Sequence, residues 1–406
     1  MRIDNQNETL AGLLQQVQDQ SARKQDYIAP TDQLQIQTIV SEVADIPNKT
    51  QVIVEGSHGS PTQILEANPV AFDQLATKAG LDVRTARRFQ ESYPDVLDHA
   101  LNRIHAAEPR NAMLRTFDIS SQTLDPIIRQ AFSDGSAIEA PASTGILRAV
   151  VSDKFKTFDN PDLLESVLPV LIESNADWQI VNADITDKRL YARFKSLAIQ
   201  GEGAAVGDLM AQGVAISNSE TGHGSVSIAQ IVWTLFCLNG MQTANKSRTA
   251  HLTGSRLEGD IAHMLTDEST EFDNRALASK LRDVTGHFAS REMFESVLEQ
   301  FRNAAGDLVE NGLAAAQPAV EALGGVLKLT KAETSSVLDG LMQTIQQPGY
   351  VGQPLSRATM VNAVTAAANN ADADSVSDWH QLGGKVLDLP VNQWAMVSTV
   401  PVAIAA

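Results

Sequence analysis

The hydrophobic and polar positions of this chain alternate in some segments and follow helical spacing in others. Within residues 33–56, the runs LQIQTIV and QVIVEG alternate on either side of a Pro-Asn turn and predict two short strands. Residues 61–108 have helical spacing, with Pro69 suited to begin a helix and Gly80 to end it. Residues 1–30 are polar with one weak helical pattern, which predicts a partly mobile arm or an interaction helix.

The middle of the chain, residues 111–256, predicts a sheet with one packed helix. Strand-like alternation occurs first in AMLRTFDIS and GILRAVVS, which are separated by an insertion at 119–143. The run DNPDLLESVLPVLIES begins with Asn-Pro, carries acids in its first turn and has helical spacing. Four more runs then predict strands: WQIVNADIT, RLYARFKSLAI, DLMAQGVAISNSE and SVSIAQIVWTLFCL. This order is typical of an α+β domain with an antiparallel sheet.

The predicted fold class is therefore α+β, with a central antiparallel sheet and a packed helix between two other regions. The N-terminal region, 31–110, has two short strands followed by helices. The C-terminal region, 257–406, is mostly helical and ends in the apolar tail VSTVPVAIAA. Helical spacing over 242–345 is expected to be interrupted at glycines: Gly259, Gly286, Gly306, Gly324 and Gly325.

Several of these runs resemble the domain-of-unknown-function 932 family. LRTFD, GILRAVVSDKFKTFDNPDLLESVLPVLIE and SVSIAQIVWTLFCLNGM carry the resemblance, and MVNAVTAAANNADADSVSDWHQLGGKVLDLP extends it to roughly residues 65–390. In that family the stretch that begins here at Arg148 has the form RAVLSDRYRPLDN. The family is carried mainly by bacteriophages and plasmids and has no settled biochemistry. The resemblance implies a mobile-element setting in a bacterial host and leaves the activity open.

Composition and charge narrow the class of protein. The single cysteine, Cys237, lies in an apolar run, which suits a buried thiol in a reducing cytoplasm. The N-terminus lacks the order of a signal peptide, and the longest apolar run, 228–241, is too short to span a bilayer. The sequence thus predicts a cytoplasmic protein without a membrane partner. The net charge of −18 argues against a generic polyanion binder, but residues 84–256 are nearly neutral, with 17 basic and 19 acidic side chains.

One predicted strand places three cations and an aromatic ring on a single face. In KRLYARFKS, the two-residue period of a strand puts Arg189, Tyr191, Arg193 and Lys195 together. Such a face suits single-stranded DNA or RNA, through stacking on the ring and phosphate contacts with the cations. The same alternation is explained by a solvated face whose intervening apolar residues pack inward, so both interpretations stay open.

Two further basic groups are candidates for the same nucleic-acid surface. Arg148, Lys154 and Lys156 surround the end of the strand GILRAVVS, beside several Asp residues. The second group lies in ANKSRTAHLTGSR and consists of Lys246, Arg248 and Arg256. Each group is either a contact for an anionic ligand or a set of ion pairs and helix caps within the protein.

A turn between two predicted strands is a candidate phosphate-binding loop. It contains Asn218, Ser219, Gly222, His223 and Gly224. Backbone amides beside the glycines, with a hydrogen bond from the imidazole, suit a phosphate group. A polar hairpin turn that needs glycine for positive φ explains the same residues.

The helical segment around Gly80 permits a helix-turn-helix interpretation. Arg84, Arg87 and Arg88 follow the glycine at i, i+3 and i+4, so they share one face of the second helix. Helix pairs with a glycine turn are also common without any role in DNA binding.

The chain contains no sequence motif of a hydrolase, nucleotide-binding loop, cofactor site or metal site, which favours a non-enzymatic protein without a cofactor. An enzyme that acts on nucleotides or DNA, with carboxylates assembled from distant positions, stays open as a further hypothesis. One hypothesis is a protein of DNA metabolism that binds single-stranded nucleic acid, promotes annealing or recombination and forms homo-oligomers. The other is an oligomeric interaction or assembly protein, with a scaffold, host-takeover or anti-defence role and no nucleic-acid binding. Convergence of the basic residues on one groove favours the first hypothesis, and internal pairing with acids favours the second.

Overall fold

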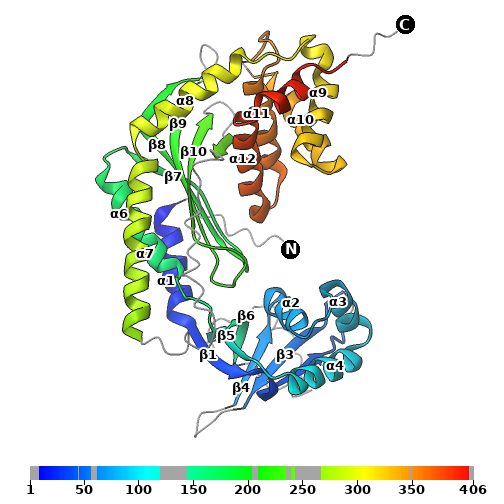
Figure 1. The fold of residues 1–406 in the computed structure, drawn as a ribbon. Coiled ribbons are helices and arrows are strands. Elements are labelled where there is room, and N and C mark those ends of the chain that lie inside the picture. Colours follow the sequence, from blue (N-terminus) through cyan, green and yellow to red (C-terminus); the bar gives the residue numbers. More distant parts are fainter. Residues whose placement is uncertain are drawn as a thin grey trace.

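The computed structural model describes residues 9–43, 45–55, 62–118, 144–203, 209–234, 239–242, 267–347 and 350–401. These residues form two β-sheets with helices packed against them, so the protein belongs to the α+β class, as the sequence predicts (Figure 1). The first sheet and three helices form one end of the molecule, the second sheet lies in the middle, and the helices after residue 290 form the other end.

The first sheet has six strands in the described residues, in the order β1-β5-β6-β4-β3-β2. Its neighbouring strands are antiparallel except for β4 and β6, which are parallel. The strands are β1 (Lys24–Pro30), β2 (Leu34–Ile39), β3 (Lys49–Val54), β4 (Gln63–Ala67), β5 (Asn111–Asp118) and β6 (Gly145–Ser152). Three helices cover it: α2 (Pro69–Lys78), α3 (Val83–Ser92) and α4 (Pro94–Ala107). The strands predicted within 33–56 and the helix between Pro69 and Gly80 are confirmed.

The second sheet has five antiparallel strands in the described residues, in the order β11-β10-β9-β8-β7. They are β7 (Trp178–Ile185), β8 (Leu190–Glu202), β9 (Leu209–Asn218), β10 (Ser227–Thr234) and β11 (Asn239–Gln242). One face packs on α6 (Asn160–Glu173), the helix predicted from its Asn-Pro start. The strands predicted in 111–118 and 145–152 are present, but they lie in the first sheet, because β5 pairs with β1 and β6 with β4.

The N-terminal segment is part of the folded core. After α1 (Leu10–Arg23), the chain continues directly into β1 at the edge of the first sheet. Leu13 and Val17 of α1 are buried in the hydrophobic cluster that contains α6 and one face of the second sheet. The weak helical pattern of this segment therefore corresponds to a helix that packs beside the second sheet and leads into the first.

The C-terminal region is helical, as predicted. Its α-helices are α7 (Asp267–Phe288), α8 (Arg291–Gly306), α9 (Ala316–Leu327), α10 (Lys331–Thr344), α11 (Arg357–Ala366), α12 (Ala373–Leu387) and α13 (Val391–Ser398). Gly306 ends α8, but Gly286 and Gly324 lie inside helices. A Cβ atom on Gly324 would approach Thr334 Oγ1 to 2.5 Å, so this glycine permits close helix packing and does not mark an interruption.

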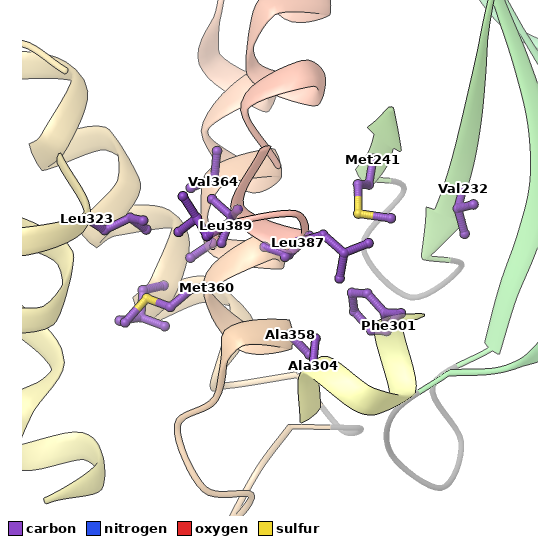
Figure 2. Close-up of a cluster of buried hydrophobic side chains, with 14 of the residues drawn as sticks. Val232, Met241, Phe301, Ala304, Leu323, Ala358, Met360, Val364, Leu387 and Leu389 are labelled. Atoms are coloured by element: carbon purple, nitrogen blue, oxygen red, sulfur yellow. The ribbon is translucent and has the colours of Figure 1, made fainter. Parts of the chain in front are cut away.

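A large hydrophobic cluster joins this helical region to the second sheet (Figure 2). Val232 of β10 and Met241 of β11 face Phe301 of α8 and Leu387 of α12 across the junction. The C-terminal helices are therefore fixed against the edge and one face of the sheet. Within the described ranges, no helix is both long enough and apolar enough to cross a membrane.

Candidate functional site

Arg148, on β6, belongs to a buried ion pair. Its Nη2 atom lies 2.9 Å from Oε2 of Glu220, in the loop between β9 and β10, and its guanidinium lies 3.9 Å from the centroid of the Phe117 ring. Both charged side chains are buried. The arginine therefore connects the first sheet to the second and does not point into an open groove.

Arg115, on β5, is the centre of the same network and has no exposed surface. It donates hydrogen bonds to Oδ1 of Asp159 at 2.7 Å and to the backbone carbonyl of Glu220 at 2.8 Å. The buried ion network, as we define it, consists of four buried residues, Arg115, Arg148, Asp159 and Glu220, together with Lys24 and Asp26, which are more exposed. The sequence pattern does not mark Arg115 as a site residue, because nothing in the alternation of β5 shows that two sheets meet there.

The environment of Glu220 keeps its carboxylate charged. Burial raises the pKa of Glu220, but Arg148, the backbone N–H of Asn160 and Arg115 together outweigh that effect, so its pKa lies below the usual range. The Asn160 N–H donates to Oε1 of Glu220 at 2.8 Å. The cations and acids of this site neutralise one another inside the protein, which is the arrangement expected of a structural joint.

Tyr191, Arg193 and Lys195 alternate along β8 as predicted, whereas Arg189 precedes the strand, and α12 lies over Tyr191 and Arg193. Tyr191 is 3% exposed and its hydroxyl lies 3.4 Å from the backbone carbonyl of Asp374 in α12. Arg193 is 2% exposed and donates to Oδ1 of Asn182 at 3.2 Å. Among the described residues, its Nη2 atom has no hydrogen-bond partner. Neither side chain is accessible for base stacking or phosphate contacts.

The two outer cations of that face have different environments. Arg189 donates from Nε to the backbone carbonyl of His223 at 2.8 Å, so it fixes the neighbouring loop. Lys195, at the other end, is partly exposed. His380 belongs to α12, where burial and, to a smaller extent, Arg193 lower its pKa well below the usual range. A neutral imidazole there avoids a second buried cation beside Arg193.

The candidate phosphate-binding loop makes most of its hydrogen bonds within the protein. Asn218 donates from Nδ2 to the Phe158 carbonyl at 2.9 Å. The Ser219 hydroxyl donates to the Lys188 carbonyl at 2.8 Å and accepts from the His223 N–H at 2.8 Å. Gly222 has a φ of 80°, so glycine is needed there for the turn, and Gly224 packs against the Arg189 guanidinium. This geometry agrees with the interpretation as a polar turn.

The remaining candidate cations fall into two groups. Lys154 and Lys156 are exposed after β6, and Lys156 pairs with Asp273 of α7 at 2.5 Å. The third basic group, Lys246, Arg248 and Arg256, lies outside the described residues. Among the residues that the structure describes, no group of three or more His, Cys, Asp or Glu side chains is arranged to hold a metal ion.

The helix α3 presents arginines to solvent. Arg84, Arg87 and Arg88 are all exposed. Arg87 is held by Asp73 of α2 through two hydrogen bonds of 2.9 and 2.8 Å. Neither Arg84 nor Arg88 forms an ion pair with any residue in the described part of the chain. Among the basic groups that lie in the described residues, this is the one whose three cations are all exposed.

Comparisons with family models, curated proteins and solved structures give no match. The resemblance to the domain-of-unknown-function 932 family therefore stays an expectation from the sequence.

Proposed function

We propose that the chain is a non-enzymatic DNA-binding protein, encoded on a phage or plasmid and active in the bacterial cytoplasm. The observation that carries the proposal is the exposed arginine group on α3, formed by Arg84, Arg87 and Arg88. Arginines at i, i+3 and i+4 of one helix can contact successive phosphates of a nucleic-acid backbone. The mobile-element setting implied by the family resemblance agrees with a role in DNA metabolism.

The position of the arginine group explains how an acidic protein can bind DNA. The net charge of −18 repels a polyanion at long range, so binding requires a local surface where cations outnumber acids. Among the residues that the structure describes, Arg84 and Arg88 of α3 form no salt bridge, whereas Arg148 is buried against Glu220. We accordingly propose α3 as the contact surface, in place of the face of β8 around Tyr191.

Fluorescence anisotropy with labelled DNA, titrated with salt, tests this function. The variant Arg84→Ala/Arg88→Ala should bind at least tenfold more weakly at low salt, and its salt slope should fall by about two if each arginine contacts a phosphate. Lys280→Ala/Arg282→Ala removes two exposed cations from α7 and should leave binding unchanged. Equal losses in both variants would indicate a non-specific charge effect and contradict a site on α3.

An oligomeric assembly protein is the second candidate, and exposed apolar side chains favour it. Val391 and Met396 of α13 are 84% and 64% exposed, and Leu308 and Leu313 are also exposed. The Glu310 N–H donates to the Ser398 carbonyl at 2.8 Å, which holds the segment of the two leucines beside the end of α13. Exposed apolar residues that lie close together are typical of protein–protein contacts.

Analytical ultracentrifugation of wild type and Met396→Glu tests the second candidate. If this surface joins copies of the chain, the wild type should sediment as an oligomer and the variant should dissociate. A monomeric wild type would contradict self-assembly through α13. Oligomerisation and DNA binding are compatible, so each experiment tests its own proposal.

A further inference from the structure

We infer that α2, the turn after it and α3 form a helix-turn-helix unit that binds double-stranded DNA, with α3 in the major groove. This inference rests on the proposed DNA-binding function and names its substrate. The sequence pattern left a plain helix pair and a DNA-binding pair as alternatives. The geometry of the turn, the attachment of α2 and the exposure of α3 favour the second.

The turn between α2 and α3 consists of four residues, 79–82. The Leu81 N–H donates to the Ala76 carbonyl at 2.9 Å and the Gly80 N–H donates to the Thr77 carbonyl at 3.0 Å, which is the Schellman pattern of a helix end. Gly80 has a φ of 72°, the conformation that this pattern requires. The Asp82 carboxylate then accepts from the Thr85 N–H at 2.9 Å and caps α3. A short turn with a glycine between two helices is typical of helix-turn-helix units.

The first helix of the pair is anchored to the rest of the protein. Gln74 accepts from the Val150 N–H at 2.7 Å and donates to the Thr221 carbonyl at 2.7 Å, so α2 is fixed to β6 and to the loop after β9. Five residues of α2 are buried: Val70, Ala71, Phe72, Leu75 and Ala76. A rigid first helix is what positions a recognition helix on DNA.

The second helix of the pair, α3, is mostly exposed to solvent. Within α3, the one buried residue is Ala86, whose small side chain allows close approach to the neighbouring helices. The C-terminal end of α3 is attached to the sheet region, because Gln90 donates to Thr50 Oγ1 at 2.9 Å and accepts at its backbone carbonyl from Asn48 at 2.9 Å. The N-terminal half is left facing solvent, and in helix-turn-helix proteins this half contacts the base edges.

The exposed side chains of that half suit duplex DNA. Arg84, Thr85 and Arg88 are exposed. Arginine recognises guanine through two acceptors in the major groove, and threonine contacts base edges or the thymine methyl group. Arg87, which Asp73 holds in one orientation, is in place to contact a phosphate and set the position of the helix.

Two DNA substrates separate this inference from the proposed function. Wild type is titrated against a labelled random-sequence duplex and against one of its single strands at the same salt concentration. We expect tighter binding of the duplex, and Arg84→Ala/Arg88→Ala should lose at least tenfold in affinity for the duplex. Binding of the single strand alone would agree with the proposed DNA-binding function but would contradict the inference that the protein binds double-stranded DNA. Binding of neither would overturn both.

Selection from a library of random duplexes tests whether α3 reads bases. The wild type should enrich a short motif, and Arg84→Ala or Arg88→Ala should relax it at one or two positions. Arg87→Lys should weaken binding of every sequence by a similar factor. An unenriched library, or a motif unchanged in both alanine variants, would overturn α3 as the recognition helix. Circular dichroism melts of each variant show that the fold is retained.

Discussion

At the scale of single residues, charged side chains in this protein fall into two groups with different roles. Arg115 and Arg148 are buried, where Arg115 pairs with Asp159 and Arg148 with Glu220, whereas Arg84 and Arg88 face solvent. Removing one partner of a buried pair leaves an uncompensated charge in a medium of low dielectric constant, which costs several kcal/mol. Substitutions in the first group should therefore affect stability, and substitutions in the second group should affect binding.

Glu220→Gln should make the stability of the protein less dependent on pH. The folded-state pKa of Glu220 is lowered from its ordinary value of 4.5, so its contribution is present above pH 4.5 and is lost as the pH falls through the folded pKa. At neutral pH the variant should lose on the order of 3–5 kcal/mol, because Arg148 remains buried without its partner. Urea unfolding at several pH values should show the difference from wild type narrowing in acid.

The matched control is Glu165→Gln, which neutralises an exposed glutamate on α6. Its unfolding should differ little from wild type at any of these pH values. A difference between Glu220→Gln and wild type that stays constant from neutral to acidic pH would show that Glu220 is not charged in the folded state.

Tyr191→Ala should destabilise the protein by roughly 3–5 kcal/mol, because it removes a buried aromatic ring. Burial, the largest effect, and the nearby carboxylates of Asp374 and Asp378 raise the pKa of Tyr191 to about 12, although Arg189 opposes the shift. Tyr191→Phe should retain most of the stability, since it loses one long hydrogen bond. Urea unfolding measures both variants. Weaker DNA binding by Tyr191→Ala at unchanged stability would instead place the ring in a binding site.

At the scale of helices and strands, local sequence signals predicted where an element begins or ends more reliably than they predicted which strands pair with one another. The Asn-Pro start of α6 and the glycine after α2 were correct, because capping and positive φ depend on a few neighbouring residues. The strand β4, in a segment predicted to be helical, was missed, since its burial depends on pairing with β3 and β6. Membership of β5 and β6 in the first sheet was missed for the same reason.

Gly80→Ala should lower stability by about 1–2 kcal/mol, since an alanine must adopt a φ of 72° there. Nothing lies within 4 Å of a Cβ at this position, so the cost is conformational and not steric. Gly325→Ala is the matched control within α9, where φ is not positive and space is also open. It should raise stability by about 0.5–1 kcal/mol. Urea unfolding that gives both substitutions the same sign would contradict the assignment of the turn after α2.

At the scale of the whole molecule, sequence patterns identified the fold class but did not locate the contact between the two sheets. The alternation in β8 correctly grouped Tyr191 with Arg193, yet the helix that covers them, α12, lies far along the chain. Whether a cation is exposed thus depends on packing between distant segments. The arginines of α3 are different, because their helix follows directly from a local turn and its face is set by helical spacing.

Arg115→Met should weaken the coupling between the two sheets. Each sheet has its own main hydrophobic cluster, and the buried ion network lies between them. Without the guanidinium, Asp26 and Asp159 lose a partner and the Glu220 carbonyl loses a donor. We expect the free energy of unfolding to fall by on the order of 3–5 kcal/mol. The loss should weaken the contact between the two sheets and not the core of either sheet. Calorimetry should therefore resolve the wild-type transition into two in the variant.

The control for this experiment is Arg103→Met, which removes an exposed arginine from α4 and should leave the calorimetric trace unchanged. A single transition in Arg115→Met, shifted to lower temperature, would mean that apolar contacts such as those of α1 couple the sheets without the ion network. Two separated transitions would show that the buried ion network couples the two sheets. Arginines that serve this purpose, such as Arg115 and Arg148, are not available to a ligand.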